Sequence, residues 1–72
     1  MLTERFSKCL RHWRRKRNLS QTQLSHKLGM SDSAVRKYEY ENRLPSLTTL
    51  DAILNALGVT VGEFFEEAEN NG

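Results

Sequence analysis

Residues that end helices divide this chain into five short segments. Asn18, Gly29 and Gly58 are of the two residue types that most readily adopt the left-handed conformation found just beyond a helix. Pro45 forces the residue before it out of the helical region. Apolar residues recur at helical spacings between these breaks, and no alternating run of β-branched residues is longer than 59–61. The sequence therefore predicts an all-α fold.

Hydroxyl-bearing residues stand where most of the expected helices begin, because their side chains can accept hydrogen bonds from otherwise unpaired amides. Ser20 with Gln23 and Thr60 with Glu63 form two capping boxes. The expected helices run over Thr3–Arg17, from Ser20 to Gly29, from Ser31 to Asn42, from Ser46 to Gly58, and from Thr60 over Phe64 and Phe65. The tail 69–72 is expected to fray.

Length and composition limit the chain to one small domain, 1–72, because domains commonly take about 100–200 residues. A single cysteine excludes an internal disulfide framework and a cysteine-rich zinc site. Cys9 and His12 are three residues apart, but His26 is the only other histidine, and no set of nucleophile, base and orienting group is evident. We therefore expect no enzyme, metal, cofactor or small-molecule substrate. No apolar run approaches the roughly 18 residues that span a bilayer, so we expect a cytoplasmic protein and no membrane.

Charge is divided sharply along the chain. Residues 1–37 hold ten Lys and Arg against two acids, whereas residues 38–72 hold one Arg against seven acids. This asymmetry indicates a polyanion facing one half of the molecule. Two alternatives are a solvated basic helix over 11–17 and a membrane-surface helix. The latter needs a broad apolar face that this segment requires for the core.

The turn between the second and third segments is very short. Only Gly29 and Met30 separate the two patterns before Ser31, so two short helices must meet at a steep angle, as in a helix-turn-helix. An ordinary corner between two helices has the same spacing and no role with DNA. The third segment favours the DNA-reading interpretation because it has both an inner and an outer stripe. The inner stripe is Ala34, Val35 and Tyr38, and the outer stripe is Asp32, Ser33, Arg36 and Lys37.

A longer set of residues, in order and without insertion, extends this pattern: Leu10, Trp13, Arg14, Leu19-Ser20-Gln21, Leu24, Leu28-Gly29, Ser31, Val35, Tyr38-Glu39, Pro45-Ser46, Leu50 and Leu57-Gly58-Val59. On these residues the run from Phe6 to Phe65 resembles the Cro/repressor-type (XRE) helix-turn-helix family of bacteria and phages. The resemblance implies a compact five-helix, lambda-repressor-like domain with its helix-turn-helix at about 20–39. It also implies a sequence-specific transcriptional regulator, a repressor that inserts its third helix into the major groove of a palindromic operator.

The resemblance assigns roles to individual residues. Asp32, Ser33 and Lys37 match positions that reach base edges, with Arg36 adjacent to them. Gln21, Ser31, Asn42 and Arg43 match phosphate-binding positions, and Arg14 and Glu39 match a structural salt bridge. Lys37 suits guanine O6 and N7, and Asp32 suits cytosine N4. Asp32 has an equal alternative, which is to stabilise the positive end of the third helix.

One position departs from the family pattern. Glu41 stands where the family usually has Gly, so we expect the third helix to run one residue longer and to end at Asn42. Glu41 would repel phosphate if its side chain pointed toward DNA.

The expected partners are double-stranded DNA and a second copy of the chain. A monomer this small reads few base pairs, and the fifth helix offers a dimer surface if Phe64 fills the core and Phe65 stays partly exposed. The alternative is that both rings are buried. Three other functions stay open: a DNA-binding antitoxin, a protein-interaction module of the same fold, and the N-terminal part of a longer regulator.

Overall fold

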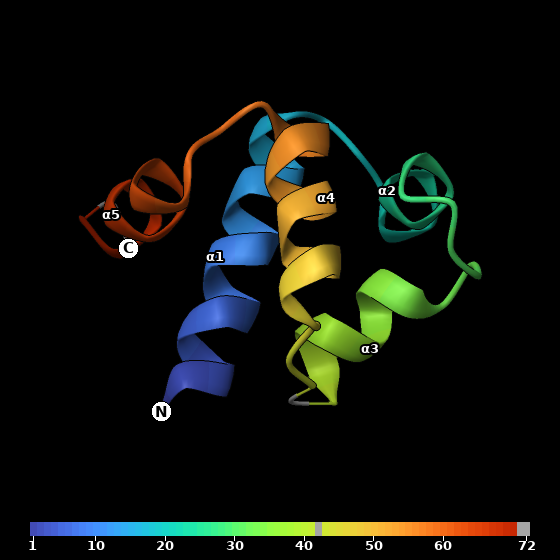
Figure 1. Ribbon diagram of the computed structural model, residues 1–72, viewed down its shortest axis with the longest axis horizontal. Helices are drawn as coiled ribbons and strands as arrows, with labels where there is room; N and C mark the ends of the chain where they lie inside the picture. Colours follow the sequence, from blue (N-terminus) through green and yellow to red (C-terminus); the bar gives the residue numbers. More distant parts are fainter. Residues whose placement is uncertain (42, 71–72) are drawn as a thin grey trace.

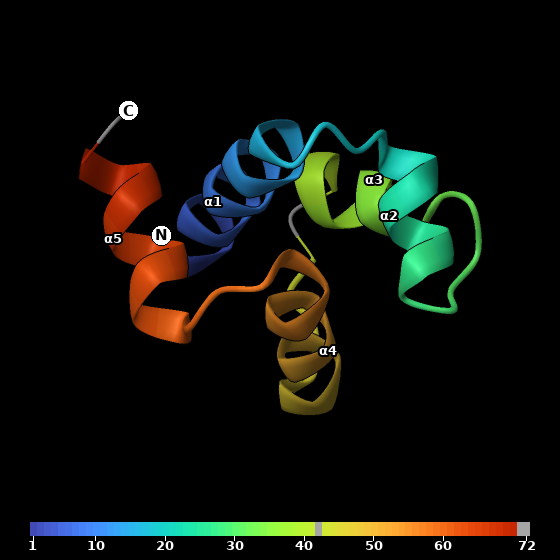
Figure 2. The ribbon, with the colours of Figure 1, turned by 90° about the horizontal axis from the view of Figure 1, so that it is seen from above.

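The computed structural model describes residues 1–41 and 43–70, and these residues contain five helices and no strand. The helices are α1 (Leu2–Lys16), α2 (Gln21–Lys27), α3 (Ala34–Tyr40), α4 (Leu47–Leu57) and α5 (Val61–Asn70). Both ribbon views place α2 and α3 on one side of α1 and α5 on the other (Figures 1 and 2). The expected all-α, five-helix fold is confirmed. None of the helices in the described part is long and apolar enough to cross a bilayer.

Three of the helices end in the same left-handed turn. Asn18, Gly29 and Gly58 have φ of 58°, 71° and 73°, as their residue types predict. The amide after each of these residues donates into the last turn of the helix: Leu19 to the carbonyl of Arg14, Met30 to Ser25, and Val59 to Leu54. The chain therefore reverses sharply after α1, α2 and α4.

Three of the expected caps are present. Ser20 and Gln23 form a reciprocal pair at α2, in which Ser20 Oγ accepts from the Gln23 amide at 2.9 Å. Ser46 caps α4, and the second capping box starts α5 at Thr60. The expected cap at Thr3 is wrong: α1 begins at Leu2, with no side-chain cap. Starting earlier lets the Arg5 amide bond the carbonyl of Met1 at 3.1 Å, which adds one backbone hydrogen bond to the helix.

The core lies where α1 meets the other helices. It consists of Phe6, Cys9, Leu10, Trp13, Leu24, Val35, Ile53, Leu57, Phe64 and Ala68, all buried. The Trp13 indole donates to the carbonyl of Phe64 at 3.0 Å, so a buried polar contact also joins α1 to α5. Phe65 is half-buried beside the buried Phe64, as expected. Burial raises the pKa of the Cys9 thiol, which fits its interpretation as a small core residue.

Acidic residues of α5 are paired with the basic helix α1. Glu69 accepts two hydrogen bonds from Arg5, at 2.8 and 3.0 Å, and Glu67 lies 2.7 Å from Lys16 Nζ and 2.9 Å from His12 Nε2. These contacts hold the Glu69 side chain at the surface of α1. Helix α5 extends through residues 69 and 70, the first half of the tail that was expected to fray. Residues 71–72 of the expected tail lie outside the described residues.

These pairs predict a specific acid sensitivity. Hydrogen bonds from Lys16 and His12 lower the pKa of Glu67 below its ordinary 4.5, and hydrogen bonding to Arg5 lowers that of Glu69 in the same way. A carboxylate with a lowered pKa stabilises the fold above its ordinary pKa and loses that contribution as the pH falls through the lowered value. The Glu67→Gln/Glu69→Gln variant should therefore lose less stability than the parent protein between about pH 6 and pH 3.

Urea unfolding at several pH values measures this difference. Glu66→Gln on the exposed face of α5 is the matched control and should follow the parent. Because the pairs are at the surface, high salt should reduce the effect. An acid sensitivity that is the same in the double variant and the parent would contradict the assignment.

Candidate nucleic-acid interface

The turn between α2 and α3 is longer than the sequence pattern suggests. The expected helix start at Ser31 is wrong, because α3 begins at Ala34 and the residue before it, Ser33, makes no side-chain cap. Asp32 and Ser33 therefore lie in the turn. Asp32 directly precedes the N-cap residue Ser33 and is not in the first turn of α3, so its alternative role at that helix end stays a prediction.

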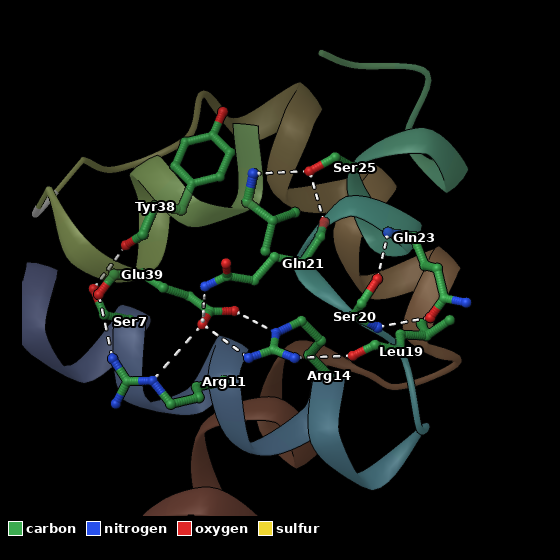
Figure 3. A network of polar contacts seen from close by, with 11 residues as sticks. Ser7, Arg11, Arg14, Leu19, Ser20, Gln21, Gln23, Ser25, Tyr38 and Glu39 are labelled. Carbon is green, nitrogen blue, oxygen red and sulfur yellow. Dashed lines mark hydrogen bonds and ion pairs between the residues drawn. The ribbon is translucent and has the colours of Figure 1, made fainter. Parts of the chain in front are cut away.

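Ser25 of α2 caps α3 from outside the helix. Its side chain is fully buried, its hydroxyl donates to the carbonyl of Gln21 at 2.8 Å, and its oxygen accepts from the Val35 amide at 3.0 Å (Figure 3). A cap supplied by α2 fixes the start of α3 relative to α2 and removes the need for a local one. Sequence reasoning missed Ser25 because its partner is ten residues away. The one sequence signal for this cap is that Ser25, a small hydroxyl residue, directly follows the apolar Leu24.

The carboxylate of Glu39 is the polar centre that joins α3 to α1 and α2. Its side chain has 0% exposure, and it accepts from Arg14 Nε at 2.7 Å and from Arg14 Nη2 at 3.1 Å. Gln21 Nε2 donates to the same carboxylate at 3.2 Å, and Arg11 Nε lies 3.7 Å from it (Figure 3). Arg14 also donates to the carbonyl of Leu19 after α1. The salt bridge between Arg14 and Glu39 implied by the resemblance is thus present, with further partners.

Backbone carbonyls near the end of α3 are also held by α1. The Ser7 hydroxyl donates to the carbonyl of Tyr38 at 2.8 Å, and Arg11 Nη2 donates to the carbonyl of Glu39 at 3.3 Å. The guanidinium of Arg11 also lies over the ring of Tyr40, 5.2 Å from its centroid. Together with the Ser25 cap, these contacts fix α3 at both ends while its outer face stays uncovered.

Helix α3 stops at Tyr40, and Glu41 is its C-cap residue without a left-handed backbone. Termination at Asn42 therefore stays a prediction. Asn42, where that helix was expected to end, lies outside the described residues. The Glu41 carboxylate is 3.6 Å from both Arg36 Nη1 and Arg43 Nε. Arg36 and Arg43 neutralise the Glu41 carboxylate, which would otherwise repel a polyanion at this surface.

Some of the candidate base-reading and phosphate-binding residues come together and others do not. Ser31, Lys37 and Arg43 line one open hollow of about 290 Å³ between the turn, α3 and the segment after it. The side chains of Asp32 and Arg36 are exposed, at 78% and 51%, and Ser33 is half-buried. The remaining candidates are Gln21, which lies at the Glu39 carboxylate, and Asn42, which is not among the described residues.

Comparison with known families identifies the class. Residues 10–64 match the family described as helix-turn-helix, and the chain belongs to that family. The match covers α2, α3 and α4 completely and α1 and α5 in part. The resemblance to Cro/repressor-type proteins, inferred from the sequence, is confirmed.

Individual relatives agree with this family. The immunity repressor protein of Bacillus phage phi105 is 39% identical over 54 residues, which are 75% of this chain but 38% of that protein, so the chain spans well under half of this relative. The wild-type restriction-modification controller protein C.Esp1396I has a TM-score of 0.83 at 21% identity, over 97% of this chain and 91% of its own. The clp gene regulator ClgR from C. glutamicum has a TM-score of 0.85 at 23% identity, over 97% and 90%. At these identities the two structures show a shared fold.

The buried ion pair predicts a large, coupled stability effect. Arg14→Met should cost about 3–5 kcal/mol, because it leaves the Glu39 carboxylate buried without its main partner. Adding Glu39→Leu to that variant should cost less than the sum of the two single substitutions, since no unpaired charge then stays buried. Urea unfolding of the four proteins measures the coupling.

Arg15→Met is the matched control, because Arg15 is the exposed neighbour on α1. It should change the free energy of unfolding by no more than about 0.5 kcal/mol. An Arg14→Met variant as stable as this control would show that the pair does not hold α3.

Proposed function

We propose that the protein is a sequence-specific DNA-binding transcriptional regulator of the repressor type that inserts α3 into the major groove of a palindromic operator. The observation that carries the proposal is the clamping of α3 at both ends with its outer face uncovered. Three comparisons support it. They are the helix-turn-helix family, the phage relative named an immunity repressor, and C.Esp1396I, which shares the fold and has a solved structure described as a nucleoprotein complex.

Lys37, Asp32, Ser33 and Arg36 are the proposed base-reading residues. Lys37 donates to guanine O6 or N7, and the exposed carboxylate of Asp32 accepts from cytosine N4. Ser33 and Arg36 lie on either side of the start of α3, close enough in sequence to contact neighbouring base pairs. These contacts give specificity, whereas phosphate contacts position the protein.

Gln21, Ser31, Asn42 and Arg43 are the proposed phosphate-binding residues. Ser31 and Arg43 support this role by lining the same hollow as Lys37, so a phosphate there lies beside the base-reading helix. Gln21 uses one amide hydrogen on Glu39, which leaves the second for a phosphate oxygen. In this arrangement the Gln21 side chain contacts both the DNA phosphate and the buried Glu39 carboxylate.

Two substitutions separate base reading from phosphate binding. Lys37→Ala should weaken binding about five- to a hundredfold at one operator position and relax the preference there. Gln21→Ala should weaken binding to all sequences alike. Titration of single-base variants of the operator, first recovered by selection from random duplex DNA, measures both effects.

Lys8→Ala removes the same charge from an exposed position on α1 and should leave specificity unchanged. Equal and uniform losses in the Lys37 and Gln21 variants would mean that α3 does not read bases.

A homodimer completes the proposal, because two copies bring two α3 helices to half-sites about one turn of DNA apart. An open groove of about 210 Å³, to which α5 contributes Phe65, supports a contact beside α5 that also involves α1 and α4. Its lining is almost wholly apolar: Leu2, Phe6, Leu44, Pro45, Leu47, Leu50 and Phe65. Leu47 is 84% exposed and Leu2 is 55% exposed, which is unusual for leucines grouped around one groove.

Charge introduced into the groove should separate the two copies. Leu47→Glu should weaken self-association at least about tenfold, because it places a carboxylate in an apolar contact. Thr48→Glu adds the same charge at the neighbouring exposed residue and should not. Sedimentation equilibrium measures association, and circular dichroism confirms that both variants fold. A parent protein that stays monomeric, or a Leu47→Glu variant that dimerises normally, would contradict this contact.

A further inference from the structure

A histidine of α2 is hydrogen-bonded to the aspartate in the turn before α3. His26 Nε2 contacts Asp32 Oδ1, which joins the last turn of α2 to the residue proposed to read cytosine. Both side chains are exposed, at 60% and 78%, so the pair lies at the surface beside the start of α3 and not in the core. The fold described above does not require this contact.

Geometry explains what the contact does for Asp32. The residue lies in a turn outside α3, where its side chain is not restrained by neighbouring helical turns. One hydrogen bond to Oδ1 restricts the carboxylate to a single direction and leaves Oδ2 as an acceptor for a base. Orienting the group before binding also reduces the entropy lost when the contact to DNA forms.

We propose that His26 is a positioning residue for base recognition: by donating from Nε2 to Asp32, it sets which base the Asp32 carboxylate selects. This inference rests on the proposed function of α3.

The chain contains its own control for the His26 substitutions. His12, the only other histidine, lies on α1 and contacts Glu67 of α5. Helix α5 is on the opposite side of α1 from α2 and α3 (Figures 1 and 2). His12→Gln should therefore keep the base preference of the parent.

Binding titrations with the intact 72-residue chain test the proposal. The probes are the operator duplex selected by the parent protein and its single-base variants. Asp32→Asn first identifies the operator position that Asp32 reads. His26→Ala should lose preference at that same position by about fivefold or more. His26→Gln keeps a neutral donor near the place of Nε2 and should restore most of the preference.

Each other outcome overturns a defined part of the account. If His26→Ala keeps the preference that Asp32→Asn loses, or if His26→Gln loses as much preference as His26→Ala, the donor at position 26 has no positioning role. If Asp32→Asn changes no position, Asp32 does not read a base and the inference fails with it. In all three cases a parent protein that still binds one selected sequence preserves the proposed function. A parent protein that selects no sequence refutes the proposed function itself.

Discussion

The arrangement of the helix-turn-helix depends on one buried carboxylate. Glu39 has no exposed side-chain surface, and a carboxylate buried in this way is costly unless its oxygens are paired. Its partners come from different helices: Arg14 and Arg11 from α1, and Gln21 from α2. Pairing this one charge therefore fixes α3 against both neighbours at once. The exposed face of α3 can then be variable in sequence without loosening its position.

Many of the basic residues in the first half of the chain form ion pairs within the fold and are not free to bind a partner. From the sequence, the basic run predicts either a polyanion-binding half or a solvated helix. In the structure, Arg14 pairs with Glu39, Lys16 pairs with Glu67 and Arg5 pairs with Glu69. The acidic second half of the chain thus neutralises much of α1. The cations proposed to meet DNA are the later ones on α3 and in the segment after it.

Local signals made most of the fold predictable. Asn18, Gly29 and Gly58 ended three helices because a left-handed residue needs little from the rest of the chain. The start of α3 was not predictable, because its cap is Ser25 on another helix. The contact between His26 and Asp32 was also not predictable, because it joins α2 to a turn and so has no helical spacing. The pairing of Arg14 with Glu39 came only from the family resemblance, since residues 25 apart give no periodic signal.

The most direct test of the account is to map, by NMR, which backbone amides change when the selected operator duplex is added to the labelled protein. The account predicts that the largest changes fall in the turn from Gly29 to Ser33, along α3 and at Gln21. Amides along α5, on the far side of α1, should change far less if the protein is dimeric before and after binding. Changes concentrated on the outer face of α1 or on α5, with α3 unaffected, would contradict the placement of α3 in the groove.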